Sequence, residues 1–315
     1  MSHGETHQGL SAPVLLIHFN RPDLTRRQIE ILARFSPPRV WVLTDGPRAG
    51  HPTDADRVAA VRSQFESLPW ECELTTIHRE HNLGVRANIS DGITRFLDAC
   101  EAGIILEDDC LPTGSFLRFA DEMLVRYRED ERIYAVSGYT GKDNGLGIHE
   151  SYTFSDYFSC WGWATWRRAW VNYDPDMHGF LNPLHWGQIH RRVFPGLRQR
   201  AYWGFILGRV SRGTTDSWAY RYQLSIWLQR GLAIFPNRNL VSNVGFGEDA
   251  TNTAGLSGTE SQELAFPLKH PEQVEASPQL NKWIEDNWHS KSPGMRFRWL
   301  LRKLRLVEGA QDTGL

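Results

Sequence analysis

Residues 103–109 read Gly-Ile-Ile-Leu-Glu-Asp-Asp, a short apolar run that ends in three consecutive acids. The apolar part predicts a buried strand. The carboxylates of Glu107, Asp108 and Asp109 repel one another, and burying all three requires a compensating charge. Divalent cations such as Mg²⁺ and Mn²⁺ supply it, because they prefer carboxylate and phosphate oxygens. Two interpretations remain open: a metal–diphosphate site for a nucleotide-sugar, or a strand followed by a solvated acidic turn in which Asp109 caps a local group.

Strand and helix patterns alternate on both sides of this stretch. Apolar runs predict further strands at 14–19, 39–43, 72–77 and 134–137, and helical spacing predicts helices between them. Repeated strand–helix units indicate an α/β fold with a mainly parallel central sheet flanked by helices on both faces. Ligands bind beyond the carboxyl ends of strands in such sheets. The segments expected to converge along one crevice are therefore 18–21, 44–46 and 107–109.

The composition is that of an ordinary globular protein, with 315 residues, 41% hydrophobic and 23% charged, and a net charge of -2. That charge argues against a protein that coats nucleic acid. The four cysteines form no Cys-x-x-Cys pair, which predicts a reducing compartment without a zinc site or a disulfide framework. The polar first ten residues predict no signal peptide, and no apolar run is long enough to span a bilayer. We expect a cytoplasmic protein, in solution or peripheral on the inner face of the cell membrane.

Tryptophans are concentrated in the second half of the chain, where residues 161–227 hold eight of the thirteen. Some must belong to the core, because aromatic rings bury large areas wherever they occur. Sugar rings also present apolar C–H faces that stack on indoles. We therefore expect two or three of these side chains to face a carbohydrate ligand and the rest to pack.

Asp216 follows a flexible polar stretch at 213–215 and precedes an amphipathic helical pattern. As an isolated feature it predicts a helix N-cap. A carboxylate at a helix N-terminus also stays ionised and can take a proton from a hydroxyl nucleophile. Both roles remain open, and they are compatible with each other.

The order of these motifs resembles the GT-A glycosyltransferases, and within them the branch of eukaryotic N-acetylglucosaminyltransferase I and its bacterial relatives. The likeness runs from about residue 13 to residue 250. The matching segments are Pro-Val-Leu-Leu-Ile at 13–17 with Asn20 and Arg21, Thr-Asp-Gly at 44–46, Ile-Ile-Leu-Glu-Asp-Asp at 104–109, Ala-Val-Ser-Gly-Tyr at 135–139 with Asp-Asn-Gly at 143–145, the aromatic-Gly-Trp segment at 157–163, and Asp-Ser-Trp at 216–218. The resemblance implies a GT-A fold and an inverting, Mn²⁺- or Mg²⁺-dependent transfer from a UDP-type sugar donor to a carbohydrate or lipid-linked glycan acceptor.

The resemblance also implies residue roles. Asp109 becomes the metal ligand, Glu107 and Asp108 accept hydrogen bonds from ribose or donor-sugar hydroxyls, and Asp216 is the catalytic base. Further donor-site candidates are Asn20, Arg21 and Asp45. Acceptor-site candidates are Trp161, Trp163 and Trp218. Arg21 also fits a surface arginine at a strand end, and Asp45 fits an ordinary turn.

Asn82, Gly84 and Arg86 lie between a predicted strand and a predicted helix. Gly84 allows a ligand to approach the backbone, and Arg86 at the helix start can meet a phosphate or a sugar. A plain loop with a helix cap fits equally.

The chain also departs from the family pattern, since Ser217 replaces a second acid and Thr-Asn-Thr at 251–253 replaces an expected histidine. The segment at 251–253 therefore lacks the titrating side chain that the family pattern has there.

We expect three segments: a flexible tail at 1–11, a glycosyltransferase domain at 12–265, and a C-terminal extension at 266–315. The domain comprises a donor half at about 12–137 and an acceptor half at about 138–265. The extension carries one apolar helical stripe flanked by arginines, formed by Phe297, Leu300, Leu301 and Leu304. This basic amphipathic helix either lies on an anionic membrane or packs on protein.

Two other functions fit parts of the pattern. A sugar nucleotidyltransferase also uses strand-end acids and Mg²⁺, although no Gly-rich phosphate loop with a basic residue follows the first strand. A non-catalytic carbohydrate-binding protein explains the tryptophans but not the acidic triplet together with Asp216. The predicted function is therefore a metal-dependent glycosyltransferase of surface-polysaccharide or glycan assembly.

Overall fold

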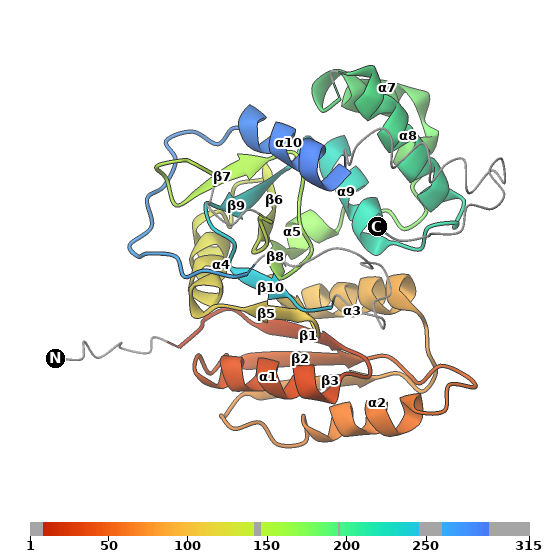
Figure 1. Ribbon diagram of the computed structural model, residues 1–315, viewed down its shortest axis with the longest axis vertical. Coiled ribbons are helices and arrows are strands. Elements are labelled where there is room, and N and C mark those ends of the chain that lie inside the picture. The colour runs from red at the N-terminus through yellow and green to blue at the C-terminus, as the bar shows by residue number, and fades with distance from the viewer. Residues whose placement is uncertain (1–8, 142–145, 195, 246–259, 290–315) are drawn as a thin grey trace, which may run out of the picture. The chain divides into compact units, whose positions relative to one another are not determined.

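The computed structural model describes residues 9–141, 146–194, 196–245 and 260–289. They form an eight-stranded central sheet covered by helices, and a separate two-stranded sheet (Figure 1). The large sheet contains β1 (Val14–His18), β2 (Arg39–Thr44), β3 (Glu73–His78), β4 (Ala102–Glu107), β6 (Ile133–Ser137), β7 (Tyr152–Ser155), β8 (Trp163–Trp166) and β9 (Leu232–Pro236). The small sheet contains β5 (Cys110–Pro112) and β10 (Val241–Asn243).

The helices follow the strands in alternation through the first half of the chain and cluster together in the second. They are α1 (Pro22–Ala33), α2 (Asp54–Ser63), α3 (Val85–Ala99), α4 (Gly114–Arg126), α5 (Arg167–Trp170), α6 (His178–Leu181), α7 (Pro183–Arg192), α8 (Leu197–Ser211), α9 (Trp218–Leu228) and α10 (Pro278–Ile284), followed by a π-helical turn, η1 (Glu285–His289). None of the helices in the described part of the chain has the length and apolar character needed to cross a bilayer.

The strand order in the large sheet is β3-β2-β1-β4-β8-β6-β9-β7. Strands β1, β2, β3 and β4 pair in parallel, and β6 pairs in parallel with β9. Because β8 is antiparallel to both β4 and β6, those two strands run in the same direction. The carboxyl ends of β1, β2, β4 and β6 therefore share one edge. The predicted α/β fold with a mainly parallel central sheet is confirmed.

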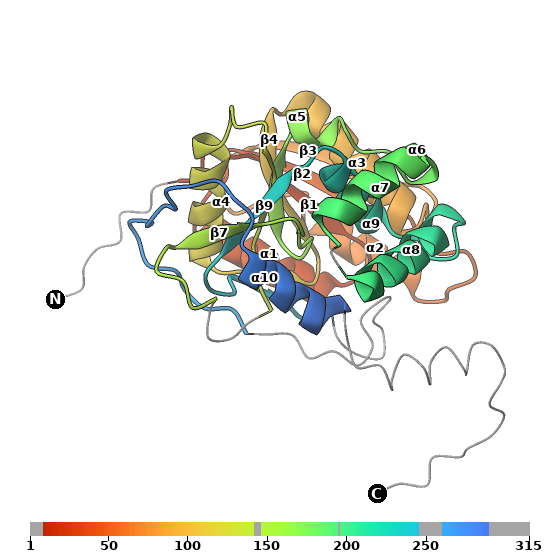
Figure 2. The same ribbon diagram turned by 90° about the horizontal axis from the view of Figure 1, so that it is seen from above.

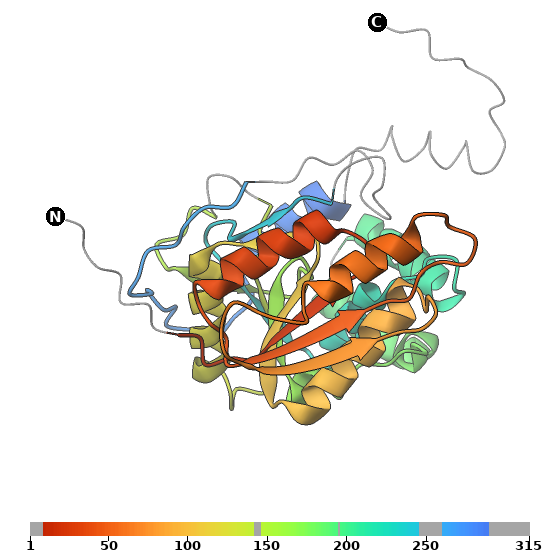
Figure 3. The same ribbon diagram turned by 90° about the horizontal axis from the view of Figure 1, so that it is seen from below.

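The two faces of the sheet are covered by different helices, because successive strand side chains point to opposite sides. Val14 and Leu16 of β1 join the core cluster that also holds Leu32 of α1. On the other face α3 approaches β2 so closely that a Cβ at Gly92 would lie 2.2 Å from the Leu43 side chain. Figure 3 shows α1 and α2 on one side of the first three strands and α3 on the other. Helix coverage of both faces is the layer arrangement that the sequence predicts.

The small sheet fastens the chain beyond the acidic triplet. β5 follows directly on Asp109 and pairs antiparallel with β10, and the backbone N–H of Val244 donates to the carbonyl of Asp109 at 2.9 Å. The strand patterns in the sequence do not predict either strand, since each has only three residues. This pairing places the end of β10 beside the acidic triplet, although Asn243 and its partner Cys110 lie more than 130 residues apart in the sequence.

The chain divides into two compact units after Ala276. Leu268 lies in the core of the first unit, and Ala276 forms a bridge with Phe154, so this unit extends past the expected boundary at 265. The second unit contains α10 and η1 among its described residues. The predicted apolar stripe at 297–304, the segments at 143–145 and 251–253, and most of the expected tail lie outside the described residues.

Candidate active site

Arg21 meets the acidic triplet where β1 and β4 end. Its Nη1 donates to Asp108 Oδ1 at 2.8 Å and to Asp109 Oδ2 at 3.1 Å. The two strands pair in parallel with Ile17 opposite Glu107, so the residues that follow both strands emerge at the same edge. The sheet thus brings together four of the residues that the sequence predicts as a donor and metal site.

The protein alone does not compensate the charge of the triplet. Burial, followed by repulsion from Asp109 and Asp108, raises the pKa of Glu107 to about 8. Burial is also the main cause that raises the pKa values of Asp108 and Asp109, and the guanidinium of Arg21 offsets this only in part. One positive charge faces three carboxyl groups, so the site favours a further cation.

This edge fits a divalent cation that protein and substrate hold jointly. Within the described ranges, no three His, Cys, Asp or Glu side chains are grouped to hold a metal ion. Mg²⁺-type ions are commonly held by one or two carboxylates while phosphate and water oxygens complete the shell. The backbone of Gly245, just after β10, lies close against this carboxylate, since a Cβ there would be 2.1 Å from Asp109 Oδ2. The residues present therefore fit a metal that arrives with a diphosphate.

A buried chain of polar side chains supports the acidic turn from α1. Gln28 Nε2 donates to the carbonyls of Glu107 and Cys110 at 3.0 and 2.9 Å, which turns its Oε1 toward His18 Nε2 at 2.9 Å. The other ring nitrogen of His18 lies 2.8 Å from the hydroxyl of Thr25. Sequence reasoning missed Gln28. The available signal was a glutamine on the same helix face as the apolar residues Ile29 and Leu32.

His18 is held neutral, and this makes the stability of the fold depend on pH. Burial is the main cause that lowers its pKa from 6.5 to about 4. Between these values the unfolded chain binds a proton that the folded protein does not, so the free energy of unfolding falls as the pH falls. From pH 7 to pH 4 the wild type should lose about 3 kcal/mol more than His18→Gln, which does not titrate. Chemical denaturation of both proteins across this range measures the difference, and parallel profiles would contradict the prediction.

Gln28→Met is expected to weaken Mn²⁺-dependent nucleotide binding by about 10–100-fold, because partners that orient metal ligands typically contribute this much. The methionine fills the space but cannot donate to the two carbonyls of the acidic turn. Gln64→Met is the matched control, since Gln64 donates to the carbonyls of Pro22 and Ala60 and does not touch the triplet. Calorimetric titration of both variants measures the effect. Equal affinities would remove Gln28 from the support of the site.

Asp45 organises the neighbouring loop. Its carboxylate accepts the backbone N–H groups of Leu83 and Gly84 at 2.9 and 3.1 Å, and Asn82 Nδ2 donates to the carbonyl of Gly46 at 2.9 Å. Gly84 stands immediately before α3 with φ +79°, and a Cβ there would have no neighbour within 4 Å. These contacts bring the loops after β2 and β3 together, so Asp45 has a structural part in this loop, and its donor-site role stays a prediction.

Asn20 is tied to the first residue of α2. Its Nδ2 donates to Asp54 Oδ1 at 2.9 Å, and hydrogen bonds from Arg48 are the main cause that holds the pKa of this buried aspartate well below its usual range. Asn20 thus orients the turn that carries Arg21.

Asp216 lies against the donor half of the site. Arg86, on the first turn of α3, donates from Nε to Asp216 Oδ1 at 2.6 Å. Because α3 follows β3, this pair stands beyond the carboxyl end of a strand parallel to β1 and β4. The capping role expected for Asp216 is wrong, since Ser217 is the N-cap of α9 and accepts the N–H of Tyr220 at 3.3 Å. Asp216 is therefore available for another function.

The structure corrects the acceptor role expected for Trp163 and Trp218. Trp163 lies in β8, between β4 and β6, and is 0% exposed, while Trp218 is 3% exposed. Their rings stack at 5.5 Å within a buried aromatic cluster that includes Trp170 and Tyr222, so neither ring has a face open to a sugar. Trp161 is partly exposed and packs edge-on against Tyr139, and its acceptor role stays a prediction.

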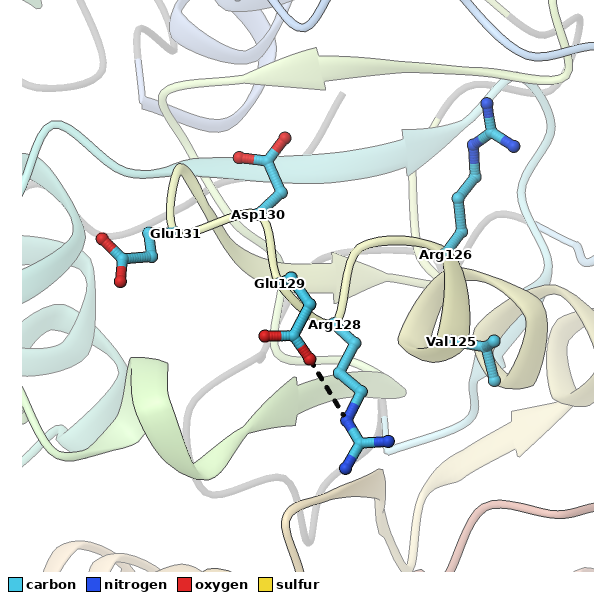
Figure 4. Close-up of a pocket in the computed structure, with 6 residues that line it drawn as sticks. All are labelled: Val125, Arg126, Arg128, Glu129, Asp130 and Glu131. Atoms are coloured by element: carbon cyan, nitrogen blue, oxygen red, sulfur yellow. Dashed lines mark ion pairs between the residues drawn. The ribbon is translucent and has the colours of Figure 1, made fainter.

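A concave surface region lies at the far end of α4 from the triplet (Figure 4). Its lining consists of Val125, Arg126, Arg128, Glu129, Asp130 and Glu131. α4 begins just after the triplet, and its 13 residues span about 20 Å. The side chains are largely exposed and pair locally, as Arg128 and Glu129 do at 3.6 Å. This region therefore belongs to the surface and not to the candidate site.

No family model and no curated protein matches the sequence. Among solved structures, the chain is similar to the mannosyltransferase PcManGT from Pyrobaculum calidifontis in complex with GDP-Man and Mn²⁺, at 12% identity and a TM-score of 0.36, over 71% of this chain and 70% of that one. It is also similar to HddC from Yersinia pseudotuberculosis, at 12% identity and a TM-score of 0.32, over 50% of this chain and 77% of that one. A third likeness is to CMP:2-keto-3-deoxy-manno-octonic acid synthetase complexed with CTP, at 15% identity and a TM-score of 0.31, over 52% and 77%. At TM-scores this low, none of these likenesses bears on the activity.

Proposed function

We propose that the protein is a metal-dependent, inverting glycosyltransferase of the GT-A class. It takes a sugar from a nucleotide-sugar of the UDP type and transfers it to a hydroxyl of a carbohydrate or lipid-linked glycan, in the cytoplasm or at the inner membrane surface, during polysaccharide assembly. The observation that carries the proposal is the convergence of the Arg21–Asp108–Asp109 group and the Arg86–Asp216 pair beyond the carboxyl ends of parallel strands.

The donor side is formed by charges of both signs. Asp109 would hold the metal, which when bound neutralises charge that develops on the leaving diphosphate. Arg21 and Arg86 offer guanidinium donors to phosphate oxygens. Glu107 and Asp108 can accept hydrogen bonds from ribose or sugar hydroxyls. The hydrogen bonds of Asp45 and Asn20 position the loops around this group.

The acceptor side needs one base. In a single displacement the acceptor oxygen forms a bond to the anomeric carbon as the bond from that carbon to the nucleotide phosphate breaks, which inverts the configuration. The hydroxyl proton must pass to a nearby group as the bond forms. Asp216 is a carboxylate beside the donor half, with 55% of its side chain exposed to an incoming acceptor. It fits this role because it lies beside the donor half while part of its side chain stays open, its ion pair being with Arg86 at the start of α3.

Thermal unfolding with nucleotides tests the proposal. UDP, GDP and dTDP are each added with and without Mn²⁺, and one of them, expected to be UDP, should raise the unfolding temperature only together with Mn²⁺. At saturating ligand the rise should be about 5 °C or more. The matching nucleotide-sugar should then release free nucleotide when incubated with the protein. No metal-dependent rise with any nucleotide contradicts the proposal, and synthesis of a nucleotide-sugar from a nucleoside triphosphate would indicate a nucleotidyltransferase instead.

A further inference from the structure

A buried arginine, Arg221, ties together three separate parts of the chain next to Asp216. Its side chain donates from Nε to the carbonyl of Pro175 at 2.8 Å, from Nη1 to that of Ser217 at 2.8 Å, and from Nη2 to that of Val210 at 3.1 Å. These carbonyls belong to the loop between α5 and α6, the N-cap of α9 and the last turn of α8. Because Ser217 directly follows Asp216, one of the three hydrogen bonds acts on the residue beside the proposed base.

Helix α9, which carries Arg221 in its first turn, lies among helices from two parts of the chain. Figure 2 shows α6, α7 and α8 grouped around it, and each of the three packs against it. Helix α3, which carries Arg86 in its first turn, contacts α9 as well. A side chain that fixes the start of α9 against α8 therefore also fixes Asp216 relative to its partner Arg86.

The position of Arg221 is unfavourable for a charge, so packing alone does not explain it. Burial is the main cause that lowers its pKa, and attraction to Tyr173 and Asp216 offsets this only in part. Its guanidinium also lies at the N-terminal end of α9, where the helix dipole disfavours a positive charge. An apolar side chain would fill the space without these costs. What a guanidinium adds is a planar fork of fixed donors that can hold three carbonyls in one arrangement.

The residues before Asp216 are held from α8. Arg209 donates from Nε to Thr215 Oγ1 at 3.0 Å and from Nη2 to the carbonyl of Thr214 at 3.1 Å. The backbone N–H of Thr214 donates back to the carbonyl of Arg209 at 3.0 Å. The chain is thus fixed on both sides of Asp216, while 55% of the Asp216 side chain stays exposed. This arrangement suits a group that must keep its place and remain accessible.

We propose that Arg221 is a positioning residue for Asp216, because it holds the start of α9 where the carboxylate can reach the acceptor hydroxyl. The inference rests on the proposed function, in which Asp216 is the base. A base must lie within hydrogen-bond distance of the proton that it takes, and a displacement of about 1 Å can lower the rate about 100-fold. Arg221 acts on the base and not on the donor, so its loss should lower turnover and leave donor affinity unchanged.

Arg221→Lys tests the proposal, because lysine keeps the charge but lacks the planar fork. It should transfer the sugar about 10–100-fold more slowly and bind the nucleotide-sugar like the wild type. Arg168→Lys is the matched control: Arg168 also donates to three backbone carbonyls, those of Tyr127, Arg128 and Ile133, and burial lowers its pKa too. These carbonyls lie at the far end of α4 from the triplet, so the control should lose similar stability and keep its turnover. Arg221→Gln, which removes the buried charge, is measured in the same way if the lysine variant does not fold.

Combining Arg221→Lys with Asp216→Asn separates positioning from a purely structural role. If Arg221 acts through Asp216, the double variant should transfer as fast as Asp216→Asn alone, because residues that act as a unit are not additive. The inference is overturned if the two effects multiply, if Arg221→Lys keeps wild-type turnover, if donor affinity falls in step with turnover, or if Arg168→Lys slows transfer equally. Wild-type transfer by Asp216→Asn would instead overturn the proposed base, so the two failures are distinguishable.

Discussion

Asp216→Asn is expected to bind the nucleotide-sugar donor like the wild type and to transfer the sugar about 10²–10⁴-fold more slowly, the usual effect of losing a positioned general base. Asparagine keeps the size of the side chain, and its oxygen can still accept the hydrogen bond that Arg86 donates at 2.6 Å. It cannot take up the proton of the acceptor hydroxyl. Initial rates at saturating substrates, with donor affinity from calorimetry, measure the two effects separately.

This substitution tests chemistry and not folding, because Ser217 caps α9. Ser217→Ala is the matched control: it should lower the free energy of unfolding by about 1 kcal/mol and leave turnover near the wild-type value. Near wild-type transfer by Asp216→Asn would exclude Asp216 as the base. A product with the anomeric configuration of the donor would contradict the inverting mechanism itself.

The acidic edge could be predicted from the sequence because strand direction alone decides it. An apolar run followed by acids, within alternating strands and helices, places Asp109 beyond a carboxyl end whatever the side chains do in detail. Arg21 follows a strand of the same direction, so it had to emerge nearby, and its ion pairs with Asp108 and Asp109 fit that expectation.

The acceptor side could not be predicted in the same way. A tryptophan signals a large buried area, but its position in the sequence does not say whether protein or ligand covers it. Trp163 is covered because β8 inserts antiparallel between β4 and β6, a long-range pairing that no local pattern encodes. Gln28 was missed for a related reason: its two acceptors belong to a strand end some 80 residues away.

Asp109→Ala is expected to abolish Mn²⁺-dependent nucleotide binding and to leave the fold intact. Residues that only orient a metal ligand typically contribute about 10–100-fold in affinity. Asp109 is the proposed ligand itself, so the loss of affinity should exceed about 100-fold. Calorimetric titration of UDP in the presence of Mn²⁺ measures it. Unchanged affinity would remove Asp109 from the metal site.

The stability of Asp109→Ala in the absence of metal is a second, independent measurement. Burial and the neighbouring Asp108 raise the pKa of Asp109, which means that the folded protein disfavours its charged form. At pH 7 that charge lowers the free energy of unfolding, so Asp109→Ala should be at least as stable as the wild type without metal. Asp23→Ala is the control, because Asp23 is an exposed aspartate on α1, paired with Arg26, that should change neither binding nor stability. A marked loss of stability in Asp109→Ala would instead favour the structural reading of the triplet, in which Asp109 serves the acidic turn and not a cation.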